Sequence, residues 1–366
     1  MSLTAGIVGL PNVGKSTLFN AITKAGVEAA NYPFATIDPN VGVVEVPDQR
    51  LDDITQVVTP QKTIPTTFEF TDIAGIVKGA SRGEGLGNKF LSNIRQVDAI
   101  CHVVRCFDDG NITHVEGKVD PASDIETINV ELILADLETV EKRIARVQKM
   151  ARMNDKEAVA EMAVLEKIKD ALEKNELANS LEFTKEQEPI VRSLFLLTRK
   201  KMLYVANIGE EEVADPSSNP YLKDVEAIAQ SQGAEVVPVC ASLEEEIAVL
   251  EDDERQAFLE DFGMNESGLD RLIQKSYSLL GLGTYFTAGE KEVRAWTFKK
   301  GMTAPQAAGI IHSDFERGFI RAETVSYDDL MKYGSMHAAK EAGRVRSEGK
   351  DYIVEDGDIM LFRFNV

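Results

Sequence analysis

One motif fixes the fold class of the N-terminal part of the chain. Residues 9–16 read GLPNVGKS, which fits the pattern GxxxxGK[ST] of phosphate-binding loops. The motif follows an apolar segment at 3–8 that is predicted to be a strand, and it opens a predicted helix, which is the context that the motif requires. Backbone N–H groups of such a loop, together with the helix N-terminus, bind phosphate. We therefore expect an α/β domain that binds a nucleotide.

The side chains of this loop have separate predicted roles. Lys15 is expected to neutralise the β- and γ-phosphate oxygens and to act in catalysis, and the Ser16 hydroxyl is expected to ligate Mg²⁺. The residues expected to contact the nucleotide here are Asn12, Val13, Gly14, Lys15, Ser16 and Thr17.

A second motif, DIAG at 72–75, closes the next apolar strand. Asp72 is predicted to hold Mg²⁺ through its water shell, and the Gly75 N–H is predicted to reach the γ-phosphate. Thr36, between the two motifs, is a candidate for a second hydroxyl on Mg²⁺. A lone threonine is more often a turn residue, but the flanking motifs favour the metal role.

The order of apolar segments indicates how the chain is organised. Runs at 68–72, 99–105, 202–207 and 235–240 alternate with helical patterns, which is typical of a parallel sheet with helices on both faces. Two long helical patterns within about 128–200 predict an antiparallel hairpin. The pattern of predicted strands and helices changes near residue 281. We therefore expect a nucleotide-binding domain at 1–280 and a small mixed domain at 281–366.

Composition narrows the classes of function. The chain has 366 residues, with 40 Lys+Arg against 61 Asp+Glu and a net charge of −21, which by itself argues against a nucleic-acid binder. Residues 142–169 are an exception, with eight basic and four acidic side chains. No apolar run approaches the length of about 18 residues that a membrane helix needs. Neither a membrane nor specific DNA sequences are therefore expected as partners, and a cytoplasmic location is predicted.

Cys101, Cys106 and Cys240 lack the spacing of metal ligands. They are expected to be buried free thiols.

The motifs carry a resemblance to a known family. GLPNVGKS, NYPFATIDPNVGVV and DIAGIVKGASRGEGLG together resemble the Obg family of P-loop proteins, and with the helical insertion and the final EGKDYIVEDGD the chain resembles the YchF/Obg-like ATPase group. The resemblance implies a Ras-like P-loop domain, an α-helical coiled-coil insertion and a C-terminal TGS domain of β-grasp fold. It also implies the ribosome or ribosomal RNA as partner, and it makes Asn12 a candidate for helping to hold K⁺. The loop Cys240-Ala241-Ser242 resembles the last base-proximal loop of the family.

The base-reading segment departs from that of P-loop GTPases. Their NKxD motif places an Asp against guanine N1–H and a Lys stem over the ring, whereas this chain has Asn207-Ile208-Gly209-Glu210 after the corresponding strand. The lysine is missing and the carboxylate is one methylene longer, so discrimination in favour of guanine should be lost. We therefore predict ATP over GTP, with Asn207, Ile208 and Glu210 near the base. Alternatively, this segment is an ordinary polar turn and the base is read elsewhere.

Slow hydrolysis is expected because Ile76 stands where Ras-like enzymes have a water-orienting glutamine. His114 is a candidate to orient or deprotonate the attacking water; a plain surface histidine is the alternative. The sequence thus predicts a slow ATPase switch that binds the ribosome through the basic hairpin, unless those lysines only keep the helix soluble. An Obg-type GTPase, or a regulatory binding module in which hydrolysis is incidental, remains open.

Overall fold

The computed structural model describes residues 3–26, 40–73, 86–110 and 117–365. The chain divides into two units. The first comprises Met1–Val43 and Glu69–Ser276, and the second comprises Val44–Phe68 and Tyr277–Val366.

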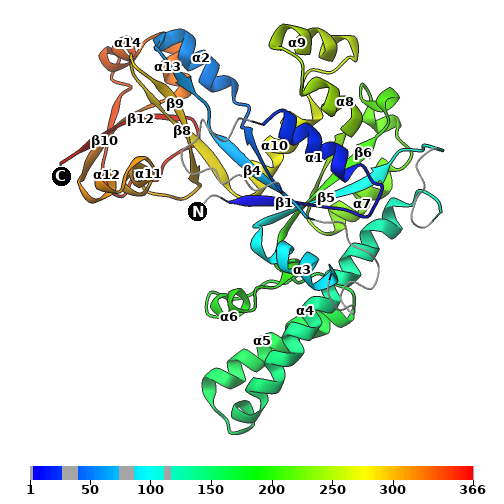
Figure 1. Cartoon of the computed structure of the whole chain (residues 1–366). Helices are drawn as coiled ribbons and strands as arrows, with labels where there is room; N and C mark the ends of the chain where they lie inside the picture. Colours follow the sequence, from blue (N-terminus) through cyan, green and yellow to red (C-terminus); the bar gives the residue numbers. More distant parts are fainter. Residues whose placement is uncertain (1–2, 27–39, 74–85, 111–116, 366) are drawn as a thin grey trace. The chain divides into compact units, whose positions relative to one another are not determined.

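The first unit is built on a six-stranded sheet (Figure 1). Its strands, in spatial order, are β2 (Val41–Glu45), β4 (Thr67–Asp72), β1 (Thr4–Val8), β5 (Ala99–Cys106), β6 (Lys201–Ile208) and β7 (Glu235–Val239). The five strands from β4 to β7 are parallel, as predicted. The edge strand β2 runs antiparallel to β4, because Asn40 accepts from the N–H of Asp72 while the N–H of Val46 donates to Thr66.

Helices cover this sheet and form the insertion. They are α1 (Lys15–Lys24), α3 (Leu86–Gln96), α4 (Pro121–Arg152), α5 (Lys156–Glu173), α6 (Glu188–Ser193), α7 (Leu222–Ser231), α8 (Ala241–Ile247), α9 (Asp252–Asp261) and α10 (Gly268–Leu279). Short 3₁₀ turns lie at Ala178–Ser180, Leu197–Arg199, Glu210–Glu212 and Pro216–Ser218. Among the described segments, no helix combines the length and apolar character of a membrane span.

The predicted hairpin is formed by α4 and α5 and extends away from the sheet (Figure 1). Asp155 begins α5 by accepting from the N–H of Ala158. Apolar residues of both helices, including Val140, Val147, Val164, Leu165 and Ile168, form a core together with residues of the segment 177–196. Helix α4 starts seven residues before the predicted boundary.

A buried carboxylate fixes the hairpin to the segment that leads into β6. Asp136 of α4 accepts hydrogen bonds from the backbone N–H groups of Leu197 and Thr198, at 2.9 and 2.8 Å, and from the Thr198 hydroxyl at 2.6 Å. Its side chain is fully buried. Three donors offset the cost of burying this group, although burial still raises the pKa of Asp136. Helix α4 is therefore anchored at Asp136 to the segment before β6, whereas its distal part contacts α5.

The second unit contains a mixed six-stranded sheet, in agreement with the predicted β-grasp domain. Its strands, in spatial order, are β11 (Arg346–Glu348), β10 (Phe319–Ser326), β12 (Asp358–Phe364), β8 (Leu282–Ala288), β9 (Val293–Lys299) and β3 (Thr63–Ile64). Its helices are α2 (Gln49–Val58), α11 (Ala304–Ile311), α12 (Ser313–Arg317), α13 (Tyr327–Tyr333) and α14 (Met336–Glu341). The pair β12–β8 is parallel, and β8–β9 is antiparallel.

The predicted domain boundary needs one correction. Residues 44–68 were expected within the domain at 1–280, but they belong to the second unit. Leu51 and Ile54 of α2 are buried in a cluster with Phe286 and Val325, and β3 pairs with β9. An amphipathic helix shows which of its faces is buried and not which sheet it covers, so the sequence pattern did not reveal this assignment.

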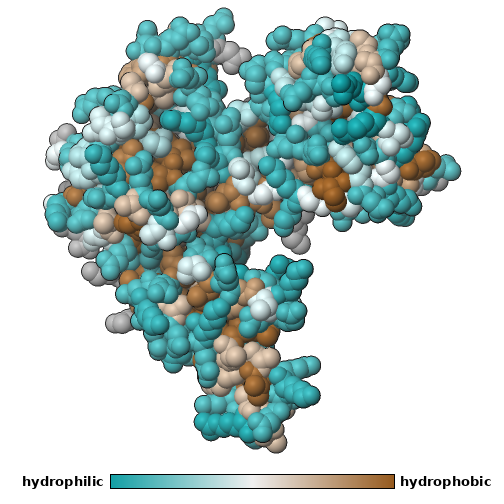
Figure 2. Space-filling view, turned by 180° about the vertical axis from the view of Figure 1, so that it is seen from behind, coloured by the Kyte–Doolittle hydropathy of each residue, from teal (hydrophilic) through white to brown (hydrophobic). Residues whose placement is uncertain are grey.

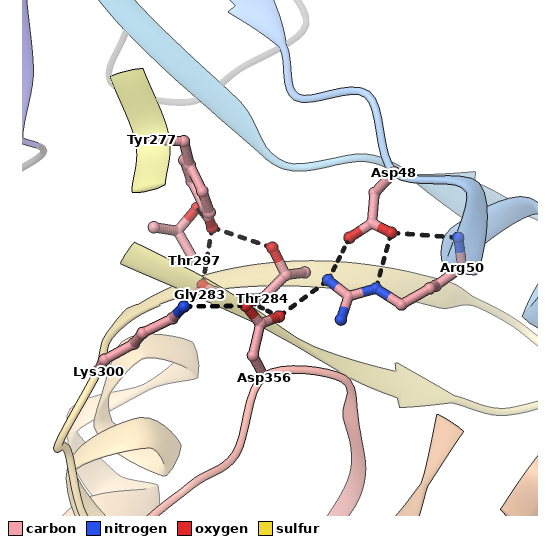
Figure 3. Close-up of polar contacts among 8 residues, drawn as sticks. All are labelled: Asp48, Arg50, Tyr277, Gly283, Thr284, Thr297, Lys300 and Asp356. Atoms are coloured by element: carbon pink, nitrogen blue, oxygen red, sulfur yellow. Dashed lines mark hydrogen bonds and ion pairs between the residues drawn. The ribbon is translucent and has the colours of Figure 1, made fainter. Parts of the chain in front are cut away.

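Ion pairs fix α2 in the second unit (Figure 3). The Arg50 guanidinium donates to both carboxylate oxygens of Asp48, at 2.8 and 2.7 Å, and to Asp356 at 2.8 Å. Asp356 also accepts from the N–H of Thr284 and lies 3.5 Å from the Lys300 ammonium. Hydrogen bonding to Asp48 raises the pKa of Arg50. The loop before β12 is thereby held against the start of α2.

One buried histidine makes stability depend on pH. His102 in β5 is 1% exposed, and neither ring nitrogen has a hydrogen-bond partner among the described residues. Burial lowers its pKa from 6.5 to about 3. The unfolded chain therefore takes up this proton near pH 6.5, while the folded chain stays neutral to about pH 3.

We predict that the free energy of unfolding falls as pH decreases below 6.5, because protonation of His102 favours the unfolded chain. At pH 5 the loss from this residue should be about 2 kcal/mol relative to pH 7.5. His102→Leu should remove that part of the pH dependence. Urea unfolding at both pH values measures it, and an equal pH dependence in the variant and the wild type would contradict the prediction.

Candidate nucleotide-binding site

A pocket of about 1000 Å³ lies in the first unit where parallel strands end. Ligands of open α/β sheets bind at this edge. Its walls come from the loop between β1 and α1, from residues 107–109 after β5, from residues 207–211 after β6, and from Ala241 and Ser242 after β7. Four loops that are distant in the sequence thus form one cavity.

The phosphate-binding loop has the backbone that its glycines permit. Gly14 has φ of +92°, and a Cβ there would lie 2.0 Å from Asn207 Nδ2. A Cβ on Gly9 would lie 2.9 Å from the Val103 carbonyl oxygen. Asn12 also has positive φ, at 64°. Side chains at the two glycine positions would fill the space that the loop needs for its turn. Successive N–H groups of a loop with such a turn can form an anion-binding concavity.

Asn207 connects two walls of the pocket. Its Nδ2 donates to the Val13 carbonyl at 2.9 Å, and its Oδ1 accepts from the Ala241 N–H at 3.0 Å. The residue is 5% exposed. Asn207, for which the sequence predicted a nucleotide contact, lines the pocket, and its side-chain amide also binds the two backbone groups. Its contribution is therefore to hold the phosphate loop against the loop after β7.

Lys15, which lines the pocket, forms an ion pair with Asp72; the two residues were predicted from separate motifs. Lys15 is 11% exposed and Asp72 is 25% exposed. Ser16 is exposed and lies with Thr17 in the first turn of α1, and both line the pocket. A hydroxyl and a carboxylate are hard oxygen donors of the kind that Mg²⁺ prefers, so the residues present fit this ion. Thr36, Gly75, Ile76 and His114 lie outside the described residues.

The segment predicted to face the base also lines the pocket. Ile208 ends β6 and is 3% exposed. Glu210 is exposed and accepts from the Ser242 hydroxyl at 3.2 Å. The neighbouring Glu212 is used within the protein, because it accepts from the Gly209 N–H at 3.0 Å and from Asn219 at 2.7 Å. The turn after β6 is therefore rigid, while the Glu210 carboxylate stays in contact with water.

The pocket wall at 107–109 was missed by the sequence analysis, which considered this loop only for His114. Arg105, 1% exposed, donates to the carbonyls of Phe107 and Asp109 at 3.1 and 3.3 Å. Its guanidinium carbon lies 4.6 Å from the centroid of the Phe107 ring. Asp108 accepts from the Tyr221 hydroxyl at 2.8 Å. An arginine near the end of a fully buried strand was the available signal for an ordered loop beyond it.

We predict that Asn207→Ala lowers ATP affinity about tenfold, equivalent to about 1.4 kcal/mol, because the phosphate loop loses its connection to Ala241. Asn207→Asp should lower it further, since a carboxylate would face the Val13 carbonyl. Titration with a fluorescent ATP analogue measures the affinity, and urea unfolding checks the fold. Asn265→Ala, at an exposed position, is the control. Wild-type affinity in Asn207→Ala would contradict the role assigned to this residue.

Comparisons with known proteins agree with this geometry. A family model described as a 50S ribosome-binding GTPase matches residues 4–167, and the YchF-GTPase_C model, described as a protein of unknown function, matches residues 282–365. The chain is 69% identical to the ribosome-binding ATPase YchF of Bacillus subtilis strain 168 and 59% identical to that of Escherichia coli O157:H7, in both cases over 100% of both chains.

The solved structure of the YchF GTPase from Schizosaccharomyces pombe is also similar. It has a TM-score of 0.88 and 41% identity, and the match covers 99% of this chain and 98% of that one. The sequence similarity to the bacterial relatives extends over the full length of the chain, and the fold is shared with the yeast structure. The chain therefore belongs to the YchF family of P-loop proteins.

Proposed function

We propose that this chain is a slow ATPase that prefers ATP to GTP and whose nucleotide state controls binding to the ribosome. The observation that carries the proposal is the combination of a phosphate cradle at Lys15 with a base-facing segment that lacks the guanine-reading residues. The two bacterial relatives described above are named ribosome-binding ATPases. A ribosomal partner would place the chain in the cytoplasm.

The preference for ATP is supported by the surroundings of Ile208 and Glu210. Residue 208 is a buried isoleucine. It therefore cannot place a lysine stem over a purine ring, as the NKxD motif does. Glu210 is exposed and already accepts from Ser242, so water and a hydroxyl compete with guanine for this carboxylate. Adenine needs an acceptor for N6–H₂ and a donor for N1, and backbone groups near Ile208 can supply both. Asn207 is proposed to act near the base by holding the loop after β7, through its hydrogen bond with the Ala241 N–H.

The phosphate end is proposed to work as in other P-loop proteins. Backbone N–H groups of residues 12–17 would bind the phosphates. The Lys15 ammonium would leave its ion pair with Asp72 and bind phosphate oxygens instead. Ser16, Thr36 and Asp72 are the proposed magnesium ligands, and Gly75 is the proposed contact of the γ-phosphate. When bound, Mg²⁺ neutralises charge on the β- and γ-phosphate oxygens. Asn12 is the proposed site for helping to hold K⁺.

Two other functions have some support. A GTPase fits the description of the matching N-terminal family model and the name of the similar fission-yeast protein. A regulatory binding module, in which hydrolysis is incidental, fits the isoleucine at position 76, since an alkyl side chain cannot orient water. Partner binding that is the same with and without nucleotide would favour the module.

Competition against a labelled ATP analogue tests base preference. We expect ATP to displace the label at least about tenfold better than GTP. The double variant Ile208→Lys/Glu210→Asp rebuilds the NKxD pattern and should shift the preference toward GTP. Asp253→Asn, at an exposed carboxylate of α9, is the control. Equal or better displacement by GTP in the wild type would overturn the ATP assignment.

His114 is the proposed group that orients or deprotonates the attacking water. We predict that His114→Ala lowers kcat about 10²-fold or more, with ATP affinity changed little, because the phosphates and base contact other residues. Single-turnover hydrolysis and equilibrium binding separate the two effects. An unchanged kcat at unchanged affinity would remove His114 from the mechanism.

A further inference from the structure

The basic residues of the α4–α5 hairpin fall into two groups of four. The first group is engaged within the protein. Lys142 pairs with Glu138, Arg143 with Glu161, and Lys169 with Glu141 and Glu173, while Lys167 donates to the Glu182 carbonyl. The second group is Arg146, Lys149, Arg152 and Lys156, whose side chains have neither ion pairs nor hydrogen bonds within the part of the chain that the structure describes.

The second group gathers at the distal end of the hairpin, at residues 146–156, which we call the hairpin tip. All four cations are exposed. Two large apolar side chains lie among them, Met150 at 50% and Met153 at 70% exposure. Figure 2 shows that the distal hairpin presents apolar surface among hydrophilic side chains. The tip therefore offers both charge and apolar surface to a partner.

Local stability explains this arrangement only in part. Lys149 and Arg152 lie in the last turn of α4, where the helix dipole favours cations. Arg146, Lys149 and Arg152 follow one another at three-residue spacing on α4, where like charges are neighbours and repel. Lys156 opens α5, although the N-terminal end of a helix favours anions. Asp155 is the single carboxylate within the tip, which therefore carries a net charge of +3 in a chain of net charge −21. A partner rich in negative charge would relieve this repulsion.

We propose that the hairpin tip binds RNA phosphates and is the contact through which the chain recognises ribosomal RNA. This inference rests on the proposed ribosome-binding function and narrows its contact from the whole hairpin to residues 146–156. The guanidinium forks of Arg146 and Arg152 match phosphate oxygens in bidentate geometry. Lys149 and Lys156 add point charges, and flexible methionine side chains can pack against exposed riboses and bases.

The test compares two variants of the full chain that lose the same number of charges. The tip variant is Arg146→Gln/Lys149→Gln/Arg152→Gln/Lys156→Gln. The control variant is Lys142→Gln/Arg143→Gln/Lys167→Gln/Lys169→Gln. The probes are deproteinised bacterial ribosomal RNA and intact 70S ribosomes, each titrated over a range of salt concentrations. ATP hydrolysis and urea unfolding are measured for every variant.

We expect the tip variant to lose at least about tenfold in RNA affinity, and the slope of log K against log salt to become shallower by about 3 units, because four phosphate contacts disappear. The control variant should stay within about twofold of the wild type. Met150→Ala/Met153→Ala should lower affinity while leaving the slope unchanged. The tip variant should unfold about as easily as the wild type, because the repulsion that is removed offsets the lost interaction of Lys149 and Arg152 with the C-terminal end of α4.

Several outcomes would overturn the inference. One is a tip variant that binds ribosomal RNA like the wild type or like the control variant. Another is a loss confined to intact ribosomes with RNA binding preserved, which would indicate a ribosomal protein as the partner. A wild-type chain that binds ribosomes in no nucleotide state would overturn the proposed function itself, whereas RNA binding that is unchanged in the tip variant affects this inference alone.

Discussion

The site depends on one amide side chain. Asn207 is the point where strand β6 holds the phosphate loop and the loop after β7 in a fixed relation, through one donated and one accepted hydrogen bond. Both partners are backbone groups, the Val13 carbonyl and the Ala241 N–H. The same amide nitrogen also explains why position 14 must be glycine, since a Cβ would collide with it. A motif near the N-terminus and another some 190 residues later thus constrain each other sterically.

The charge of the pocket complements this geometry. Among its described lining residues, Lys15 is the single basic side chain, whereas Asp108, Asp109, Glu210 and Glu211 are acidic. In this structure Lys15 is paired with Asp72. A triphosphate would therefore enter a pocket of its own sign of charge, and a divalent cation bound with it reduces the repulsion. This balance makes the proposed affinity for free ATP lower than that for its magnesium complex.

Features carried by local chemistry were predictable from the sequence. The loop at 9–16 and the parallel order of β4 to β7 follow from motif and alternation, and the hairpin follows from helical periodicity. Features that depend on which surfaces meet were not predictable. The burial of α2 against Phe286 and the wall at Phe107 depend on long-range packing, and a pattern along the chain does not record it. The ion pairs of the hairpin cations were not predictable for the same reason. The sequence does not distinguish Arg143 from Arg146, and only the fold brings Glu161 beside Arg143.

The assignment of residues 44–68 to the second unit has a practical consequence for dissecting the molecule. The chain passes between its two units three times, near 43, 68 and 276. A polypeptide that ends at residue 280 would keep Leu51 and Ile54 but lose most of the sheet that buries them. The apolar face of α2 would then be exposed to water in the remaining fragment. Such a fragment would aggregate for reasons unrelated to nucleotide chemistry. Excising the second unit cleanly requires removing 44–68 as well, which includes the end of β2 and the start of β4, and joining residue 43 to residue 69.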